Sequence, residues 1–151
     1  MSRNVANRLV YSPHNYSSSN GGASSFANYA AFKAALDSAW GYIITGSQPY
    51  TTPVWVGEFG TNNTSPDDVA SDLDAFAGDP SAAWWTWIRQ YLADDDLDWA
   101  VWTLNGTEGD GFSRTYRATE TYGVLMPDWS TPAPQPFIAA LQALQPATQK
   151  P

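Results

Sequence analysis

Three short apolar segments, 8–14, 54–59 and 98–104, limit the fold of this chain most strongly. They are rich in β-branched and aromatic residues and are bounded by proline, glycine or asparagine, as strands are. The run 54–59 is suited to a strand buried on both faces. Apolar residues at helical spacing fill 26–44 and 82–93. Strands that alternate with amphipathic helices pair in parallel through right-handed crossovers, so the sequence predicts an α/β fold.

Helix-start and turn signals divide the remainder of the chain. Pro66 at a first helical position predicts a further helix over 66–76. A long loop is predicted over 107–136, and a closing helix over 137–144 precedes a frayed tail over 145–151. Loops of this length are usually functional or disordered, so the loop is a candidate for function.

Composition excludes several classes of protein. The 43% hydrophobic and 15% aromatic content is that of a globular domain, and 151 residues permit one core. Only 7 basic residues stand against 15 acidic ones, and the net charge of −8 excludes nonspecific binding to nucleic acid or to anionic membranes. A neutral polysaccharide is compatible with this charge. Without cysteine the sequence offers no disulfide, thiolate metal ligand or thiol nucleophile, and it implies no cofactor.

The beginning of the chain carries no targeting signal that the sequence reveals. Residues 1–9 lack the apolar core of a signal peptide, and no stretch approaches the roughly 20 apolar residues of a membrane span. As written, the sequence therefore predicts neither a secretion signal nor a transmembrane helix.

Residues whose side chains could bind a ligand or take part in a reaction lie at the end of each predicted strand. They are His14 and Tyr16, then Glu58, then Trp102 and Asn105. In parallel α/β architectures, groups at the carboxyl ends of strands converge on one cleft. We therefore expect these side chains to lie close together.

The residues alone leave each of these roles open. An ionised carboxylate in the apolar setting of Glu58 must be hydrogen-bonded or used, so it is either a paired structural group or a functional one. His14 is the only histidine and could be structural, and Trp102 could stack on a sugar or pack in a core. We interpret the acidic run 94–96 as a solvated turn after a helix rather than as a metal site.

Three motifs in order resemble those of glycoside hydrolase family 5, the cellulase and mannanase group of (β/α)8 barrels. In that family the sixth strand ends in His-x-Tyr, which His14 and Tyr16 match. The seventh ends in Gly-Glu-Phe-Gly, matched by 57–60, and the eighth carries a tryptophan, matched by Trp102. The resemblance implies that 1–144 is the C-terminal part of a catalytic barrel, containing its last three βα units.

The resemblance also implies a mechanism and roles for individual residues. Family members are retaining glycosidases, so Glu58 would be the nucleophile, and His14 and Tyr16 would hold it ionised and oriented. Trp102 would lie beneath the sugar and Asn105 would contact it. The implied substrate is β-1,4-linked glucan, and the implied localisation is extracellular.

The family's acid/base glutamate lies in an Asn-Glu-Pro motif that this sequence lacks. Glu108 and Glu120 are expected to serve loop structure or to contact outer sugars. A barrel of this type needs about 250 residues, so we expect the chain to be incomplete and to assemble with the missing N-terminal segment or with itself. The alternatives are a noncatalytic carbohydrate-binding or assembly fragment and a fragment that does not fold.

Overall fold

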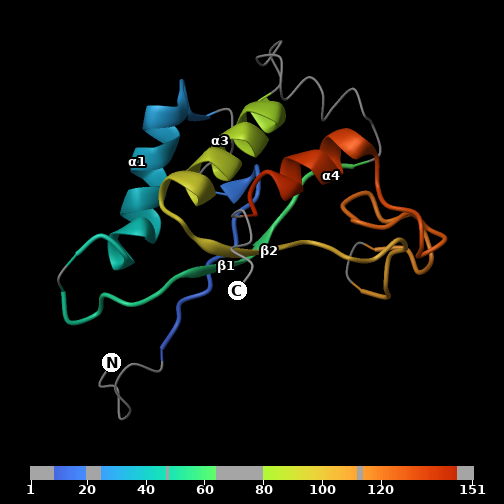
Figure 1. The fold of residues 1–151 in the computed structure, drawn as a ribbon, viewed down its shortest axis with the longest axis horizontal. Helices are drawn as coiled ribbons and strands as arrows, with labels where there is room; N and C mark the ends of the chain where they lie inside the picture. The colour runs from blue at the N-terminus through green and yellow to red at the C-terminus, as the bar shows by residue number, and fades with distance from the viewer. Residues whose placement is uncertain (1–8, 20–24, 47, 64–79, 112–113, 146–151) are drawn as a thin grey trace, which may run out of the picture.

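The computed structural model describes residues 9–19, 25–46, 48–63, 80–111 and 114–145. The elements in these ranges are α1 (Tyr29–Ala39), the 3-10 turn η3 (Gly41–Ile43), β1 (Trp55–Phe59), α3 (Pro80–Asp94), β2 (Asp98–Val101) and α4 (Gln135–Gln142). Figure 1 shows the three helices on one side of the two strands. The predicted helix over 66–76 and the tail from 146 lie outside the described residues.

Strand β1 has a backbone neighbour on each edge. On one edge it pairs in parallel with β2, with Trp55 opposite Asp98. On the other edge Tyr11 and His14 form parallel bridges with Val54 and Glu58. The predicted parallel arrangement is therefore present, with β1 between its two neighbours.

The predicted strand over 8–14 is interrupted, because Pro13 has no backbone N–H to donate. Tyr11 donates to the Pro53 carbonyl and accepts from the Trp55 N–H, at 3.2 and 2.9 Å. Pro13 can only accept, from the Gly57 N–H at 3.0 Å. Two isolated bridges thus replace a continuous strand, but they align the segment with β1.

The third predicted strand is shorter than expected, since β2 ends at Val101 and not at 104. Beyond that point the Thr103 N–H donates to the Tyr122 carbonyl at 3.0 Å, and the Thr103 carbonyl accepts from the Val124 N–H at 2.7 Å. The chain therefore leaves β1 to pair with the long loop. An antiparallel bridge between Thr107 and Thr119 joins two parts of this loop.

The helices also begin and end at residues that differ from the predicted ones. Asn28 caps α1, its side-chain oxygen accepting from the Ala31 N–H at 3.0 Å, so the helix begins after the cap and not at 26. It ends at Ala39, before η3. Helix α3 begins at Pro80 rather than at 82, and α4 begins at Gln135 rather than at 137.

The core lies between the strands and the helices. The ring of Trp85 in α3 stacks between Phe59 of β1, at 5.6 Å, and Phe137 of α4, at 5.8 Å. All three side chains are buried. The register of β1 shifts between Val56 and Phe59, and both of these side chains are buried. Trp55 points to the face opposite that of its neighbour Val56 and is 47% exposed. The expectation that this strand is buried on both faces is therefore wrong for the described residues, because the helices cover only one face.

Polar contacts join α1 to α3 and to the acidic run 94–96 at the C-terminal end of α3. The Tyr29 hydroxyl donates to Asp94 at 2.6 Å, and Lys33 pairs with Asp95 at 2.8 Å. The Tyr91 hydroxyl donates to Asp37 at 2.8 Å. Part of the acidic run thus links two helices.

Within the described ranges, no helix combines the length and apolar character needed to cross a membrane.

Replacing Trp85 with alanine should lower the free energy of unfolding by about 3–5 kcal/mol, because it opens a cavity between two aromatic rings. Trp55→Ala removes the same side chain from an exposed site and should change it by about 0.5 kcal/mol or less. Urea unfolding followed by far-ultraviolet circular dichroism measures both values. Equal losses would contradict this account of the core.

Candidate active site

The end of β1 brings together residues from three segments that are far apart in the sequence. His14 bridges Glu58 on one edge of the strand. On the other edge the Trp102 N–H donates to the Phe59 carbonyl at 2.8 Å. The carboxyl ends of the strand segments therefore meet, and they bring predicted site residues to the same end of the sheet.

Two glycines allow this close approach on either side of Glu58. A β-carbon at Gly57 would overlap Ser12 Oγ and come within 3.4 Å of His14 Nε2. A β-carbon at Gly60 would overlap the Trp102 carbonyl oxygen. The Gly-Glu-Phe-Gly sequence thus supplies a carboxylate on a strand whose neighbours can come close on both edges.

The Glu58 carboxylate has two polar partners from the first segment. Its Oε2 accepts a hydrogen bond from the Tyr16 hydroxyl at 3.0 Å, and His14 Nδ1 lies 3.4 Å from the same oxygen. The Glu58 side chain is 30% exposed. Glu58 is therefore paired, as a structural glutamate would be, but it is also accessible to a ligand.

Tyr16 is a hydroxyl donor over the whole physiological pH range. Burial, the hydrogen bond to Glu58 and the negative charge of that carboxylate raise the pKa of Tyr16 well above its usual 10.0. Its ring and the Tyr122 ring are arranged edge to face, with ring centroids 6.5 Å apart. The phenol can therefore orient Glu58 without competing for a proton.

Trp102 and Asn105 follow the end of β2. The Trp102–Thr103 peptide bond is cis, and the indole of Trp102 is 36% exposed, with the Arg114 guanidinium carbon 5.9 Å from the ring centroid. Asn105 is half-buried and directly precedes the bend at Gly106. The indole therefore has surface available to an apolar ligand face.

Sequence reasoning missed the importance of Asn15, which is only 1% exposed. Its side-chain oxygen accepts from the Trp84 indole N–H at 2.8 Å, and its backbone N–H donates to the Glu58 carbonyl at 2.9 Å. The alternation of His14, Asn15 and Tyr16 was the available signal, because successive side chains of an extended segment point to opposite faces. Asn15 therefore anchors the segment that carries the two partners of Glu58.

The acidic loop residues have structural partners. Glu108 accepts from the Thr115 N–H at 2.6 Å, and the buried Glu120 forms an ion pair with Arg114. Among the residues that the structure describes, no group of three or more potential ligands could hold a metal ion.

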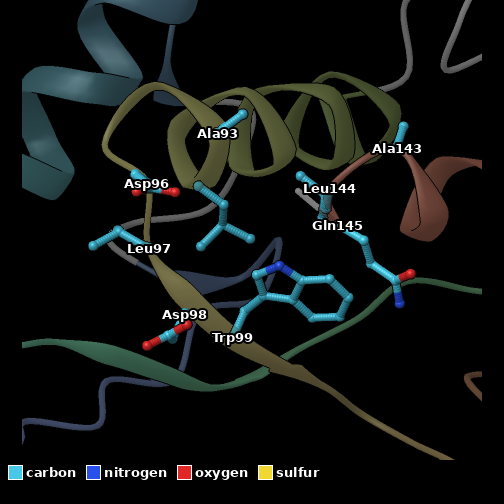
Figure 2. A pocket seen from close by; sticks show the side chains of 9 residues that line it. Ala93, Asp96, Leu97, Asp98, Trp99, Ala143, Leu144 and Gln145 are labelled. Carbon is cyan, nitrogen blue, oxygen red and sulfur yellow. The ribbon is translucent and has the colours of Figure 1, made fainter. Parts of the chain in front are cut away.

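A hollow of about 580 Å³ lies away from these residues, at the beginning of β2. Figure 2 shows it between the C-terminal ends of α3 and α4, with Trp99 and Leu97 among its lining residues. It adjoins Asp98, the first residue of β2, whereas the candidate site lies beyond the last. Its lining includes none of the predicted site residues.

Parallel strands with helices on one side are an α/β arrangement (Figure 1). Barrels and open sheets of this class build their sites at the carboxyl ends of the strands, where the candidate residues lie in this chain. A family model described as cellulase (glycosyl hydrolase family 5) matches residues 2–108. The chain belongs to glycosyl hydrolase family 5. The resemblance found in the motifs is thereby confirmed.

Similar proteins support this assignment. An endoglucanase from Paenibacillus polymyxa is 35% identical over 133 residues, which cover 84% of this chain and 27% of that protein. A glycosyl hydrolase 5 family protein from Chamaecyparis obtusa is 29% identical over 119 residues, covering 74% and 18%. The chain thus spans less than a third of the length of these relatives.

Solved structures establish the fold. A complex of an endocellulase from Pyrococcus horikoshii with cellotetraose has a TM-score of 0.61 at 23% identity, covering 93% of this chain and 33% of that one. A cellulase–inhibitor complex has a TM-score of 0.58 at 22% identity, covering 90% and 31%. Cellulases of this family are (β/α)8 barrels, and this chain matches a part of one. The assignment of its strands as the sixth to the eighth stays a prediction.

The raised pKa of Tyr16 makes stability depend on pH in the alkaline range. Below about pH 10 the phenol is protonated in both the folded and the unfolded chain, whereas above it only the unfolded chain loses the proton. The free energy of unfolding should therefore fall as pH rises above about 10. Tyr16→Phe should make this fall shallower, and urea unfolding between pH 8 and 11 measures it.

The exposed Tyr116 provides the matched control, since Tyr116→Phe removes a hydroxyl from the loop surface. If both substitutions change the alkaline slope equally, the hydrogen bond from Tyr16 to Glu58 is not the cause.

Proposed function

We propose that this chain supplies the nucleophile, Glu58, to the active site of a retaining glycoside hydrolase that cleaves β-1,4-linked glucan. The observation that carries the proposal is the partly exposed Glu58 carboxylate at the end of β1, with the Tyr16 hydroxyl at 3.0 Å and His14 Nδ1 at 3.4 Å on one oxygen. A carboxylate that is open to ligand and oriented by a donor suits attack on a sugar.

In the first step a Glu58 oxygen attacks the anomeric carbon, and the bond to the leaving glycosidic oxygen breaks as a second carboxyl group protonates that oxygen. In the second step water, deprotonated by the same second group, releases the sugar and restores the Glu58 carboxylate. The Tyr16 hydroxyl, which donates to Glu58 Oε2, orients the carboxylate for this attack. The His14 ring lies beside the same oxygen, with Nδ1 3.4 Å away.

The relatives support β-1,4-glucan as the substrate class. One is named an endoglucanase, and an endocellulase was solved with cellotetraose. In two cellotetraose complexes of that endocellulase the substituted residues are a glutamate and a tyrosine, 43 positions apart. Glu58 and Tyr16 are 42 positions apart here. The residue types are the same and the separations differ by one position, which favours equivalent roles.

Trp102 and Asn105 contact the sugar in this proposal. An exposed indole face matches the apolar C–H face of a pyranose, and the Asn105 amide can exchange hydrogen bonds with sugar hydroxyls. Both residues follow β2, whose end adjoins the end of β1. A sugar on Trp102 would therefore lie beside Glu58.

The acid/base carboxyl group comes from outside the described residues in this proposal. Glu108 bonds to its own loop, and Glu120 is buried against Arg114, so both carboxylates already serve the loop. Retaining chemistry needs two carboxyl groups about 5–5.5 Å apart. The partner is therefore the N-terminal part of the barrel, which the family's length implies, and the complete enzyme acts outside the cell.

A noncatalytic carbohydrate-binding or assembly fragment is the second candidate. It is favoured by the absence of the Asn-Glu-Pro motif from the sequence, while Trp102 keeps an exposed indole. Hydrolysis of a soluble cellulose derivative by the purified monomer would exclude this candidate.

Glu58→Gln should lower the turnover of a soluble cellulose derivative on the order of 10³-fold or more, measured in a barrel completed by an N-terminal part, because the amide cannot form the glycosyl intermediate. Glu108→Gln removes a carboxylate from the loop and should keep most of the activity. Near-normal turnover with Glu58→Gln would contradict the nucleophile assignment.

A further inference from the structure

One buried carboxylate connects the loop after β2 to both sides of the candidate site. The Glu120 side chain is 2% exposed and forms an ion pair with Arg114 through Oε2. Its other oxygen accepts from the Tyr122 N–H at 3.1 Å. Because a buried charge is costly unless it is paired and hydrogen-bonded, these partners hold Glu120 in place.

Arg114 contacts both the buried Glu120 carboxylate and the indole of Trp102. The guanidinium carbon of Arg114 lies 5.9 Å from the centre of that ring, within the range in which a cation is attracted to an aromatic face. The Arg114 side chain is 29% exposed, and Trp102 is 36% exposed. The contact therefore leaves part of the indole open to a ligand.

Tyr122 contacts both the Glu120 carboxylate and Tyr16, the hydrogen-bond partner of Glu58. The Tyr122 ring meets the Tyr16 ring edge to face, with centroids 6.5 Å apart and planes at 64°. Tyr16 in turn donates to Glu58 at 3.0 Å. A continuous set of contacts thus runs from the nucleophile candidate through Tyr16, Tyr122 and the loop to the indole.

We propose that Arg114 and Glu120 are positioning residues for the Trp102 indole: Glu120 fixes the guanidinium, and the guanidinium fixes the ring plane before a glucan arrives. The proposal rests on the proposed function in so far as the indole binds sugar. Fixing the ring in advance reduces the ordering cost of binding, so these residues act on affinity through Trp102 without touching substrate.

The direct test measures the exposure of the Trp102 indole in the absence of sugar. Arg114→Met keeps an unbranched apolar stem but removes the cation, so acrylamide should quench the Trp102 fluorescence more strongly. Because the chain has 8 tryptophans, the same substitution is also made in a Trp102→Phe background. An increase in quenching that is absent from that background comes from Trp102. Arg114→Lys retains a cation and should restore much of the protection. Unchanged quenching in Arg114→Met would overturn the proposal.

The second measurement titrates cellotetraose against the same chains. Arg114→Met should bind about two- to tenfold more weakly than the unchanged chain, and Arg114→Lys should fall between them. Equal affinities overturn the assignment of Arg114. If the unchanged chain binds no cellotetraose, the proposed sugar-binding role fails, and the quenching result still decides whether Arg114 fixes the indole.

Glu120→Gln tests the carboxylate itself, because it removes the charge and keeps the shape. It should raise the quenching of Trp102 only while Arg114 is present, and Glu120→Gln with Arg114→Met should equal Arg114→Met alone. Additive effects would show that the two residues act separately and would overturn the role of Glu120. A thermal melt identifies any variant that unfolds. If one does, the decisive comparison is the quenching of Trp102 in Arg114→Lys with that in Arg114→Met.

Discussion

The pairing of β1 with a neighbour on each edge is the interaction on which the candidate site depends. Bonds on one edge align the segment of His14 and Tyr16, and the bond from Trp102 to Phe59 fixes the other edge. Without both pairings, residues separated by more than forty positions would not meet. The glycines on either side of Glu58 make both approaches possible, because a β-carbon at either position would overlap its neighbour.

The core supports this arrangement from one side. Phe59 directly follows Glu58 and packs on Trp85, so burial of that ring fixes the end of the strand from which the carboxylate projects. Asn15 does the same for the neighbouring segment through its bond to Trp84. Helix α3 therefore holds both segments of the site by adjacent tryptophans, one through stacking and one through a hydrogen bond.

Sequence patterns predicted the parallel order of the segments and the gathering of residues at the strand ends, because strand and helix periodicity follow from apolar spacing. They did not predict the end of β2 at Val101, since the competing partner, Tyr122, lies in a loop without periodicity. The exposure of Trp55 was also missed, because an apolar run does not reveal which face helices will cover. Glu120 was recognised only as a loop residue, since burial of a carboxylate depends on a distant arginine.

Covalent trapping tests the central claim, that Glu58 is a nucleophile, most directly. A dinitrophenyl 2-deoxy-2-fluoro-β-cellobioside has a leaving group that departs without a proton donor, so formation of the glycosyl ester needs a nucleophile but no acid. Mass spectrometry of the digested chain should find one added fluorinated cellobiosyl group on the peptide that contains Glu58, and none in Glu58→Gln. A label on another carboxylate, or equal labelling of Glu58→Gln, would contradict the account.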